Sequence, residues 1–329
     1  MPKGDNTRKV TDAEIIEAWK TNASITELAM KFDMAERTLR HRIRGLRAKG
    51  FALESFDVRS KYYVHADNPW HWQNLDKHPG VIQLDIQDGV VLIGSDSHYW
   101  PGIISTAHRG FVHFCEKLDP KIVIKNGDEL DFPRLSRYAP IGWENRPEVV
   151  NEIEAAQERL GEIERAAPNA IKCWTCGNHD ARFESKLANT APEYARVHGV
   201  HLKDHFPMWR PCWTVQLNKD TVVKHRFKAG IHAPHNNTMW AGKSIFTGHL
   251  HSLKVMPLSD LNGTRWGVDC GTMADPYGPQ FYNYTEINPV NWRSGFVVLT
   301  FIGGQLLWPE IAFVRSEGVI DFRGELIHV

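Results

Sequence analysis

The chain has 329 residues, of which 42% are hydrophobic, which is enough for one large domain with a substantial core and one small module. Lys plus Arg and Asp plus Glu both number 39, so the chain as a whole has no charge bias toward nucleic acid or a membrane surface. Five cysteines exclude a dense secreted disulfide framework, and the lack of a signal peptide or of ~18 consecutive apolar residues indicates a cytoplasmic protein with no membrane partner.

The first fifty residues predict three short helices, at Asp12–Thr21, Ser24–Lys31 and Ala35–Ala48. From Ala35 to Lys49 there are six basic residues against one acid, which suits a helix that lies near phosphates. The apolar spacing over the last two helices, with a short turn between them, resembles the helix-turn-helix family. The apolar positions are Ile25, Leu28, Ala29, Leu39 and Ile43.

That resemblance implies a DNA-binding module over residues 1–50. The DNA contacts would fall on the third helix, near Glu36 and at Arg37, Arg40, His41 and Arg44. The alternative is a small three-helix cap or oligomerisation module whose arginines face solvent. The sequence leaves the oligomeric state open.

Residues 51–80 are rich in aromatic residues and histidine and have no clean period, so we expect a linker that packs on the following domain. From residue 81 onward, short apolar runs predict strands, and a long helical stretch, Pro147–Ala167, lies among them. This alternation predicts an α/β domain over residues 81–329. The predicted strands are Val90–Gly94, Ile122–Lys125, Ala170–Trp174, Thr221–Lys224 and Ser244–Thr247.

Residues of metal-ligand type follow the first two of these strands. Alternate residues of an extended chain point to one side, so Asp96 and His98 can reach one ion together. After the second strand, Gly127 lets the backbone turn closely and Asp128 can bridge two ions.

Two further motifs follow later strands. Asn178 offers an amide oxygen that suits a hard cation, and the adjacent His179 can protonate a leaving group. His249 and His251 are two imidazoles at alternate positions, one for each ion. Each motif alone is common, but four in this order at strand ends indicate a two-metal site.

The four motifs together resemble the calcineurin-like metallophosphoesterases, a superfamily that includes protein Ser/Thr phosphatases, purple acid phosphatases, cyclic-nucleotide phosphodiesterases and a double-strand-break repair nuclease. The resemblance runs from residue 81 to the C-terminus and implies a sandwich of two mixed β-sheets with helices outside. It also implies two divalent ions, with Mn²⁺ preferred and Mg²⁺, Fe, Zn²⁺ or Ni²⁺ as alternatives. The first ion would be held by Asp96, His98 and His251, the second by Asn178, His225 and His249, with Asp128 bridging both.

One ligand in this set, the histidine upstream of His249, has three candidates. His225 ends a predicted strand and lies 23 residues before Gly248, a spacing similar to that of phage and bacterial relatives. Those relatives usually have a glycine after the histidine, whereas this chain has Arg226. His232 and His235 therefore stay open as alternatives.

The resemblance also implies roles around the ions. His179 would be the general acid, with Asp180 orienting its ring and raising its pKa. Arg182 would clamp a phosphate oxygen, or else form a surface ion pair. We expect Asp131 to orient the Asp128 loop rather than bind metal. We interpret Cys173-x-x-Cys176 as part of a buried strand rather than as a redox or zinc motif.

The implied reaction is hydrolysis of a phosphate ester by a hydroxide held between the two ions. Because a basic helical module in the same chain would hold a polymer near the metals, the preferred hypothesis is a DNA-directed phosphodiesterase, that is, a nuclease. The alternatives are a phosphomonoesterase or small-nucleotide phosphodiesterase, and a non-catalytic DNA-binding protein. A phage gene would fit, in which case the host cytoplasm is the expected location.

Overall fold

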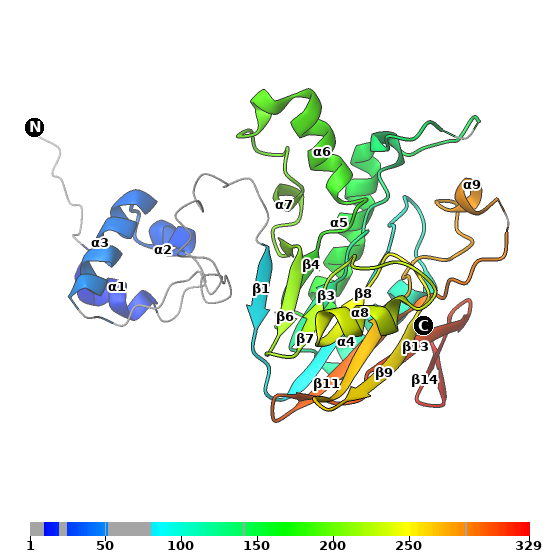
Figure 1. Ribbon diagram of the computed structural model, residues 1–329. Coiled ribbons are helices and arrows are strands. Elements are labelled where there is room, and N and C mark those ends of the chain that lie inside the picture. Colours follow the sequence, from blue (N-terminus) through cyan, green and yellow to red (C-terminus); the bar gives the residue numbers. More distant parts are fainter. Residues whose placement is uncertain (1–9, 20–24, 50, 52–79, 141, 287) are drawn as a thin grey trace, which may run out of the picture. The chain divides into compact units, whose positions relative to one another are not determined.

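The structure, a computed structural model, describes residues 10–19, 25–49, 51, 80–140, 142–286 and 288–329 (Figure 1). The chain folds as two compact units, Met1–Tyr63 and Val64–Val329. The boundary between the two units falls within residues 52–79, which the structure does not describe. Almost all of the expected linker 51–80 therefore lies outside the described residues. The division into 1–50, 51–80 and 81–329 stays a prediction.

The N-terminal unit contains the three expected helices, α1 (Asp12–Trp19), α2 (Ile25–Lys31) and α3 (Glu36–Ala48). Thr11 and Glu14 form a reciprocal capping pair at the start of α1, where the Glu14 N–H donates to Thr11 Oγ1 at 3.2 Å and the Thr11 N–H donates to Glu14 Oε2 at 2.8 Å. The apolar faces of the helices meet in one small core, formed by Ile15, Ala18, Trp19, Leu28, Ala29, Leu39, Ile43 and Leu46.

The second unit is built on two mixed β-sheets. The six-stranded sheet has the order β1 (Val81–Leu84), β6 (Thr214–Leu217), β7 (Thr221–Val223), β8 (Ser244–Thr247), β10 (Gly263–Asp269), β9 (Lys254–Asp260). The nine-stranded sheet has the order β15 (Glu325–His328), β14 (Val319–Phe322), β13 (Glu310–Ser316), β11 (Gly295–Ile302), β2 (Gly89–Gly94), β3 (Ile122–Lys125), β4 (Ile171–Thr175), β5 (Arg210–Cys212), with β12 (Gln305–Leu306) paired to β11.

Helices cover the outer faces of both sheets (Figure 1). On the nine-stranded sheet, α4 (Thr106–Leu118) packs on β2, β11, β13 and β14 and on the neighbouring α5 (Val149–Ala166). On the six-stranded sheet, α8 (Ala233–Ala241) packs on β8, β9 and β10. The predicted sandwich of two mixed sheets with helices outside is confirmed. The remaining short helices are η3 (Pro133–Leu135), α6 (Ala181–Thr190), η4 (Pro192–Tyr194), α7 (Leu202–His205) and α9 (Tyr282–Thr285).

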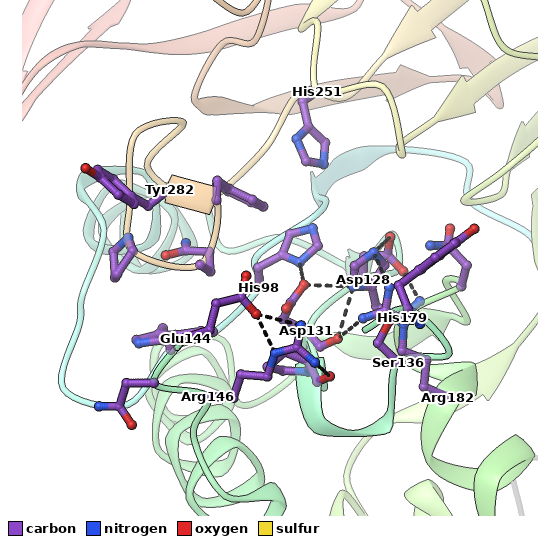
Figure 2. A pocket seen from close by; sticks show the side chains of 18 of the residues that line it. His98, Asp128, Asp131, Ser136, Glu144, Arg146, His179, Arg182, His251 and Tyr282 are labelled. Atoms are coloured by element: carbon purple, nitrogen blue, oxygen red, sulfur yellow. Dashed lines mark hydrogen bonds and ion pairs between the residues drawn. The ribbon is translucent and has the colours of Figure 1, made fainter. Parts of the chain in front are cut away.

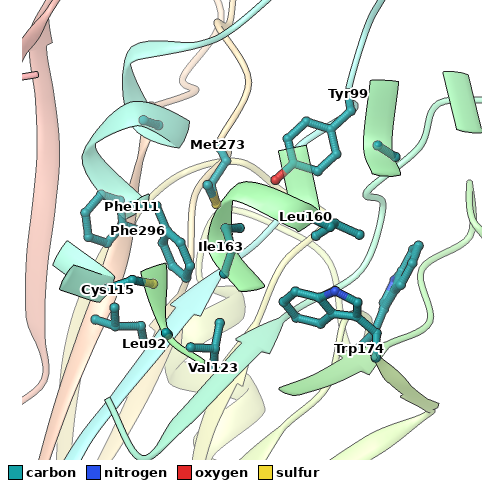
Figure 3. Packing of buried hydrophobic residues seen from close by; sticks show 14 of the residues in the cluster. Leu92, Tyr99, Phe111, Cys115, Val123, Leu160, Ile163, Trp174, Met273 and Phe296 are labelled. Carbon is teal, nitrogen blue, oxygen red and sulfur yellow. The ribbon is translucent and has the colours of Figure 1, made fainter. Parts of the chain in front are cut away.

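The main core lies between the nine-stranded sheet and the helices α4 and α5 (Figure 3). Leu92 and Val123 contribute from neighbouring parallel strands, and Phe111 and Leu160 from the two helices. The strand β3 is buried at every position, which explains the apolar run Ile122–Ile124, and its last residue, Lys125, is buried as well. The predicted strands agree with β2, β3, β4, β7 and β8 to within one residue at each end.

The five cysteines are free and buried. Cys173 lies inside β4 and Cys176 directly follows this strand, and burial raises the pKa of Cys173 to about 12. The interpretation of Cys173-x-x-Cys176 as buried strand rather than a redox or zinc motif therefore agrees with the structure. No helix within the described ranges is both long and apolar enough to cross a membrane.

Glu152 in α5 provides a pH-dependent contribution to stability. It is buried, its Oε1 accepts a hydrogen bond from the Phe132 N–H at 2.8 Å, and its Oε2 has no partner among the described residues. Burial raises the pKa of Glu152 from 4.5 to about 8, although the Phe132 N–H lowers it. The folded state therefore favours the neutral carboxyl group.

We expect the free energy of unfolding to fall as the pH rises through about 8, because the stabilisation from neutral Glu152 is complete below 4.5 and is lost as the group ionises. Glu152→Gln should flatten this slope, and the matched change Glu154→Gln at an exposed position of the same helix should not. Urea unfolding at several pH values measures the slope. An unaltered slope in Glu152→Gln would contradict the expectation.

Candidate metal centre

The carboxyl ends of strands from both sheets bring the expected ligands together. Because β2, β3 and β4 run parallel, the residues that follow them meet at one edge of the nine-stranded sheet. The parallel pair β7 and β8 presents its own carboxyl ends from the six-stranded sheet. The residues placed in this way are Asp96 and His98 after β2, Asp128 after β3, Asn178 after β4, His225 after β7, and His249 and His251 after β8.

The expected ligands form two groups of donor atoms, and His98 also belongs to a third group with Asp131 and His179. In the first, one donor atom each from Asp96, His98 and His251 lie within 4.8 Å of one another, and His251 Nε2 is 3.0 Å from Asp96 Oδ1. In the second, Asp128, His225 and His249 meet the same limit. His225 links the two groups, since its Nε2 is 3.0 Å from Asp128 Oδ2 and 4.0 Å from Asp96 Oδ1.

Hydrogen bonds fix how two of the imidazoles face the site. His98 Nδ1 donates to Asp131 Oδ1 at 3.0 Å, and His225 Nδ1 donates to the Asn126 carbonyl at 2.7 Å. The Nε2 lone pair of each ring is therefore turned inward. His98 Nε2, His225 Nε2 and the Asn178 amide oxygen are all shielded from solvent. None of these three atoms has a hydrogen-bond partner among the described residues.

These unpaired atoms fit divalent cations. The Nε2 of His225 and an Asp128 oxygen are both lone-pair donors only 3.0 Å apart, and such a contact is favourable only with a positive charge between them. Carboxylate, imidazole and amide ligands together suit Mn²⁺, Zn²⁺ or a similar ion. The residues present therefore fit the expected two-metal centre.

The pKa values of His225 and Asp128 reflect the attraction between these two side chains. Burial lowers the pKa of His225, but Asp128 and Asp96 outweigh it and raise the value to about 10. Burial raises the pKa of Asp128, but His225 and His179 hold it well below its usual range. Asp128 is therefore a carboxylate, and a positive charge, from a proton or from a metal ion, is required beside His225.

The backbone is strained where the ligands are attached. Five candidate ligands have φ in the left-handed region, where a non-glycine residue costs about 1–3 kcal/mol. Two backbone hydrogen bonds hold part of this geometry, from Asp96 N–H to the Gly127 carbonyl at 2.8 Å and from His98 N–H to the Asp128 carbonyl at 3.0 Å. Strain of this kind is concentrated at functional sites. The φ values are 54° for Asp96, 40° for His98, 52° for Asp128, 73° for His249 and 59° for His251.

Two glycines allow the ligand loops to approach closely. A Cβ atom on Gly127, which has φ +80°, would lie 2.6 Å from the His225 ring. A Cβ atom on Gly177 would lie 2.0 Å from Asp128 Oδ1. A side chain at either position would displace a ligand, which explains why glycine precedes these motifs.

Of the three histidine candidates after β7, the structure brings only His225 to the ligand groups. His225 is 1% exposed, and the other two lie at the start of α8. His232 is the N-cap of that helix and is exposed, and His235 contacts the neighbouring Asn236 at 3.5 Å. Neither belongs to a donor group among the described residues.

The roles expected for two acids around His179 are wrong and are exchanged. Asp131 was expected to orient the Asp128 loop, but its Oδ1 lies 2.8 Å from His179 Nδ1 and also binds His98. Asp180 was expected to orient the His179 ring, but its carboxylate faces the opposite direction, into the protein. Burial lowers the pKa of His179, while Asp128 and Asp131 raise it above its usual value.

Asp180 instead holds the ligand loops in place. Its buried carboxylate accepts backbone N–H groups from the loop after β3 and from the loop after β4, and an indole N–H from Trp174. Asp180 is the N-cap residue of α6 but makes no capping hydrogen bond to that helix, so among the described residues its carboxylate accepts only from the loops and from Trp174. The donors are the N–H groups of Asp128 at 2.9 Å, Glu129 at 2.9 Å, Leu130 at 3.3 Å and Gly177 at 2.8 Å, and Trp174 Nε1 at 3.0 Å.

Asp180→Ala should lower the free energy of unfolding by about 3–5 kcal/mol, because it leaves several buried donors without an acceptor. Chemical denaturation in EDTA measures this loss without a contribution from metal. Asp220→Ala, at an exposed aspartate, should change the stability by less than about 0.5 kcal/mol. Equal free energies of unfolding for the two variants would contradict the role of Asp180 in holding the ligand loops.

A buried ion pair that was not predicted from the sequence joins two ligand loops. Lys125 Nζ lies 3.0 Å from Glu129 Oε2, and it donates to Ser97 Oγ at 2.7 Å. Both charged side chains are fully buried. Burial raises the pKa of Glu129 to about 8, although Lys125 lowers it. Through the hydrogen bond from Lys125 to Ser97, the pair connects the end of β3 with the loop after β2.

Arg182 lies beside His179 at the edge of the site (Figure 2). Its Nη1 donates to the Asp131 carbonyl at 2.7 Å, and its Nη2 is 3.2 Å from His179 Nε2. Its guanidinium group therefore faces the site, next to the ring that was expected to donate a proton.

The ligands open into a cavity of about 930 Å³ (Figure 2). One wall is aromatic: Phe281 packs against His98 with ring centroids 4.9 Å apart, and Trp292 packs against His251 at 4.6 Å. This wall was not predicted from the sequence, although aromatic residues are dense between Tyr277 and Trp292. The other aromatic residues that line the cavity are Trp100, Tyr138 and Tyr282.

Comparison with known proteins gives similarity at the level of structure. No known family model matches the sequence, and no curated protein matches it significantly. Among solved structures, the chain is similar to wild-type Vps29 from Entamoeba histolytica complexed with zinc, with 13% identity and a TM-score of 0.39, over 73% of this chain and 98% of that one.

Two further solved structures are similar to the chain. One is described as a novel archaeal phosphodiesterase, with 12% identity, a TM-score of 0.34, and coverage of 68% of this chain and 99% of that one. The other is a protein serine/threonine phosphatase from Saccharomyces cerevisiae with similarity to human PP5, with 14% identity, a TM-score of 0.38, and coverage of 86% and 97%.

The expected DNA-contact residues lie on the surface of α3. Arg37, Arg40, His41 and Arg44 are all exposed, and Arg40 pairs with Glu36 at 3.3 Å. A different arginine, Arg42, is used inside the unit, where it binds Asp12 and donates to the Val10 carbonyl at 2.7 Å. The exposed set is thus available to phosphates, while Arg42 holds α3 against α1.

Proposed function

We propose that the protein is a metal-dependent phosphoesterase of the calcineurin-like type that uses two divalent cations, with Mn²⁺ preferred. The main support is the pair of adjoining donor groups linked through His225. His98 Nε2, His225 Nε2 and the Asn178 amide oxygen have no hydrogen-bond partner among the described residues. Asp96, His98 and His251 would hold one cation, and Asn178, His225 and His249 the other, with Asp128 between them.

Cations in such a site would polarise a phosphoryl oxygen and would lower the pKa of a bound water molecule to about 7. The chain's own residues supply the proton transfer. His179 Nδ1 is held by Asp131, which orients the ring and keeps Nε2 on the cavity side, 3.9 Å from Asp128 Oδ2. Because its pKa is raised, protonated His179 can donate from Nε2 to the departing oxygen.

Arg182 supports the same step. In this structure the Arg182 Nη2–H donates to His179 Nε2 at 3.2 Å, so that nitrogen is the acceptor. Once His179 is protonated both groups are donors, and an oxygen of a bound phosphate would take the place of this contact and accept from the guanidinium group and the imidazolium together. The Asp131 carbonyl fixes Arg182 by accepting from Nη1. We propose that Arg182 clamps the phosphate and does not form a surface ion pair.

The preferred substrate is DNA, which makes the protein a nuclease. The support is the exposed basic face of α3 in a separate unit of the same chain, which would hold a polymer near the metal centre and raise its effective concentration. A small-nucleotide phosphodiesterase is the second candidate, because an aromatic-walled cavity of about 930 Å³ could enclose one nucleotide.

One assay matrix tests these proposals. Bis-nitrophenyl phosphate, mono-nitrophenyl phosphate, single-stranded DNA and duplex DNA are each incubated with Mn²⁺ or EDTA. The proteins are the wild type and a variant with Arg37, Arg40 and Arg44 all changed to alanine. We expect hydrolysis that requires metal, prefers diesters, and on DNA falls in the triple variant.

Three outcomes would contradict the proposals. Hydrolysis that persists in EDTA would remove the metal mechanism. Diester hydrolysis without any cleavage of DNA would favour the small-nucleotide candidate. Metal-independent DNA binding with no hydrolysis of any ester would instead indicate a non-catalytic DNA-binding protein.

A further inference from the structure

A long acid-free segment surrounds three of the candidate ligands. Between Asp220 and Asp260 the sequence has no aspartate or glutamate, although it includes His225, His249 and His251. The segment forms β7, the loop that follows it, α8, β8 and the start of β9. It creates a local positive potential in a chain whose overall charge is zero. Its basic residues are Lys224, Arg226, Lys228, Lys243 and Lys254.

Large apolar side chains are exposed on the same segment. Trp240 is 69% exposed, Ile231 74%, Met239 58% and Phe227 43%. The opposite side of α8 is packed on the six-stranded sheet, so this exposed side is the free face of the helix (Figure 1). We call the surface formed by Arg226, Phe227, Lys228, Ile231, Met239 and Trp240 the α8 surface.

Both aromatic rings of the α8 surface have a lysine ammonium group beside them, one from Lys228 within the surface and one from the neighbouring Lys224. Lys228 Nζ lies 3.6 Å from the centroid of the Trp240 ring, and Lys224 Nζ lies 5.2 Å from that of Phe227. Each pair puts an ammonium group beside an exposed ring. This combination suits a ligand that offers both a negative charge and a flat π-face, as a nucleotide does.

The surface is held in a defined geometry. The buried side chain of Asn237 in α8 accepts from the Lys228 N–H at 3.0 Å and donates to the Lys228 carbonyl at 3.3 Å. Lys254 Nζ donates to the Ile231 carbonyl at 3.0 Å, which ties the start of β9 to the same loop. Two elements therefore fix the loop, and little ordering is needed when a ligand binds.

The loop also connects directly to the metal centre. Arg226 and Lys228 follow His225 by one and three residues, and α8 connects β7 and β8, the strands that precede His225 and His249. A polymer held by Arg226 would therefore lie next to the backbone that carries His225.

We infer that the α8 surface binds a single-stranded segment of nucleic acid and leads it to the metal centre. Phosphates would contact the lysine and arginine side chains, and bases would stack on Trp240 and Phe227. The inference rests on the proposed phosphodiesterase function and specifies its substrate further. A duplex, whose bases are already stacked, would not use these rings.

Binding is measured with a fluorescent 20-nucleotide oligothymidylate and the full-length chain in EDTA, so that no cleavage occurs. The background is the triple alanine variant at Arg37, Arg40 and Arg44, which removes binding by α3. Trp240→Ala should raise Kd about tenfold, because one stacked base is lost. Lys228→Ala should raise Kd and should lower the slope of log Kd against log salt by about 0.7, because one phosphate contact is lost.

Two exposed residues outside the α8 surface provide matched controls. Trp308→Ala and Lys186→Ala remove the same side-chain types elsewhere, and neither should change Kd by more than about twofold. Thermal melting of all variants checks that each is folded. If Trp240→Ala and Lys228→Ala bind the oligonucleotide as well as these controls do, the inference is overturned.

A second measurement separates this inference from the proposed function. In Mn²⁺, the ratio of kcat/KM for the oligonucleotide to kcat/KM for bis-nitrophenyl phosphate should fall about tenfold in Trp240→Ala. A wild type that binds the oligonucleotide through Trp240 but hydrolyses neither substrate would contradict only the proposed function. If Trp240→Ala instead loses binding to vesicles rich in phosphatidylserine and keeps its oligonucleotide Kd, the surface binds lipid and the inference fails.

Discussion

Asp128→Asn is expected to lower kcat/KM for phosphoester hydrolysis by about 10³-fold or more. The change keeps the size of the side chain and the acceptor for the His179 N–H, which Asp128 Oδ1 now binds at 2.7 Å. It removes the negative charge that lies 3.0 Å from His225 Nε2, between the two donor groups. Loss of the bridging carboxylate weakens both cation sites. Metal ions contribute several kcal/mol to stabilisation of the transition state, which corresponds to a rate loss of about 10³-fold.

Metal binding gives an independent measure of the same change. Titration calorimetry with Mn²⁺ should show two bound ions in the wild type, and weaker or incomplete binding in Asp128→Asn. The matched control is Asp85→Asn at an exposed position, for which both activity and stoichiometry should be unchanged. Full activity with two tightly bound ions in Asp128→Asn would rule out a bridging role.

His179→Asn should lower kcat by about 10²–10⁴-fold for esters with an alkoxide leaving group, such as DNA. The asparagine amide can still donate to Asp131, so the link at His179 Nδ1 is kept while the proton donor at Nε2 is lost. Nitrophenolate leaves without needing a proton, so we expect a loss of less than about tenfold with nitrophenyl esters.

The leaving-group dependence distinguishes proton donation from a structural role. Single-turnover rates are compared for bis-nitrophenyl phosphate and a dinucleotide, with His328→Asn as the exposed control. If both substrates lose the same factor in His179→Asn, then His179 positions the site or the phosphate and does not protonate the leaving group.

Much of the candidate site could be predicted from short stretches of sequence. In each case the ligand follows a strand within a few residues, as Asp96 and His98 follow β2 and Asp128 follows β3. Strand ends are local features that apolar runs reveal, and parallel strands place their carboxyl ends at one edge. The strand-end motifs therefore indicated that these residues gather at one edge, and the resemblance supplied which of them would share an ion.

The sequence was less informative where the contact partner is distant in the chain. His179 and Asp180 are neighbours, so a direct pair seemed natural, but the partner of the ring is Asp131, 48 residues earlier. The Asp180 carboxylate lies in the interior, where it accepts from five N–H groups, three in the loop after β3, one in the loop after β4 and one from Trp174. Satisfying buried donors outweighs adjacency in sequence.

By itself, the sequence determined an α/β domain, the limits of five strands to within a residue, and the chemical types gathered at the strand ends, because apolar runs and strand-end motifs are local. The two-sheet architecture was what the resemblance implied. Only the tertiary structure decided which acid serves which histidine, that His225 rather than His232 or His235 lies among the ligands, and that aromatic rings wall the cavity. These features depend on close approach between distant loops, such as the Gly127 backbone against the His225 ring, and packing of this kind has no local signature.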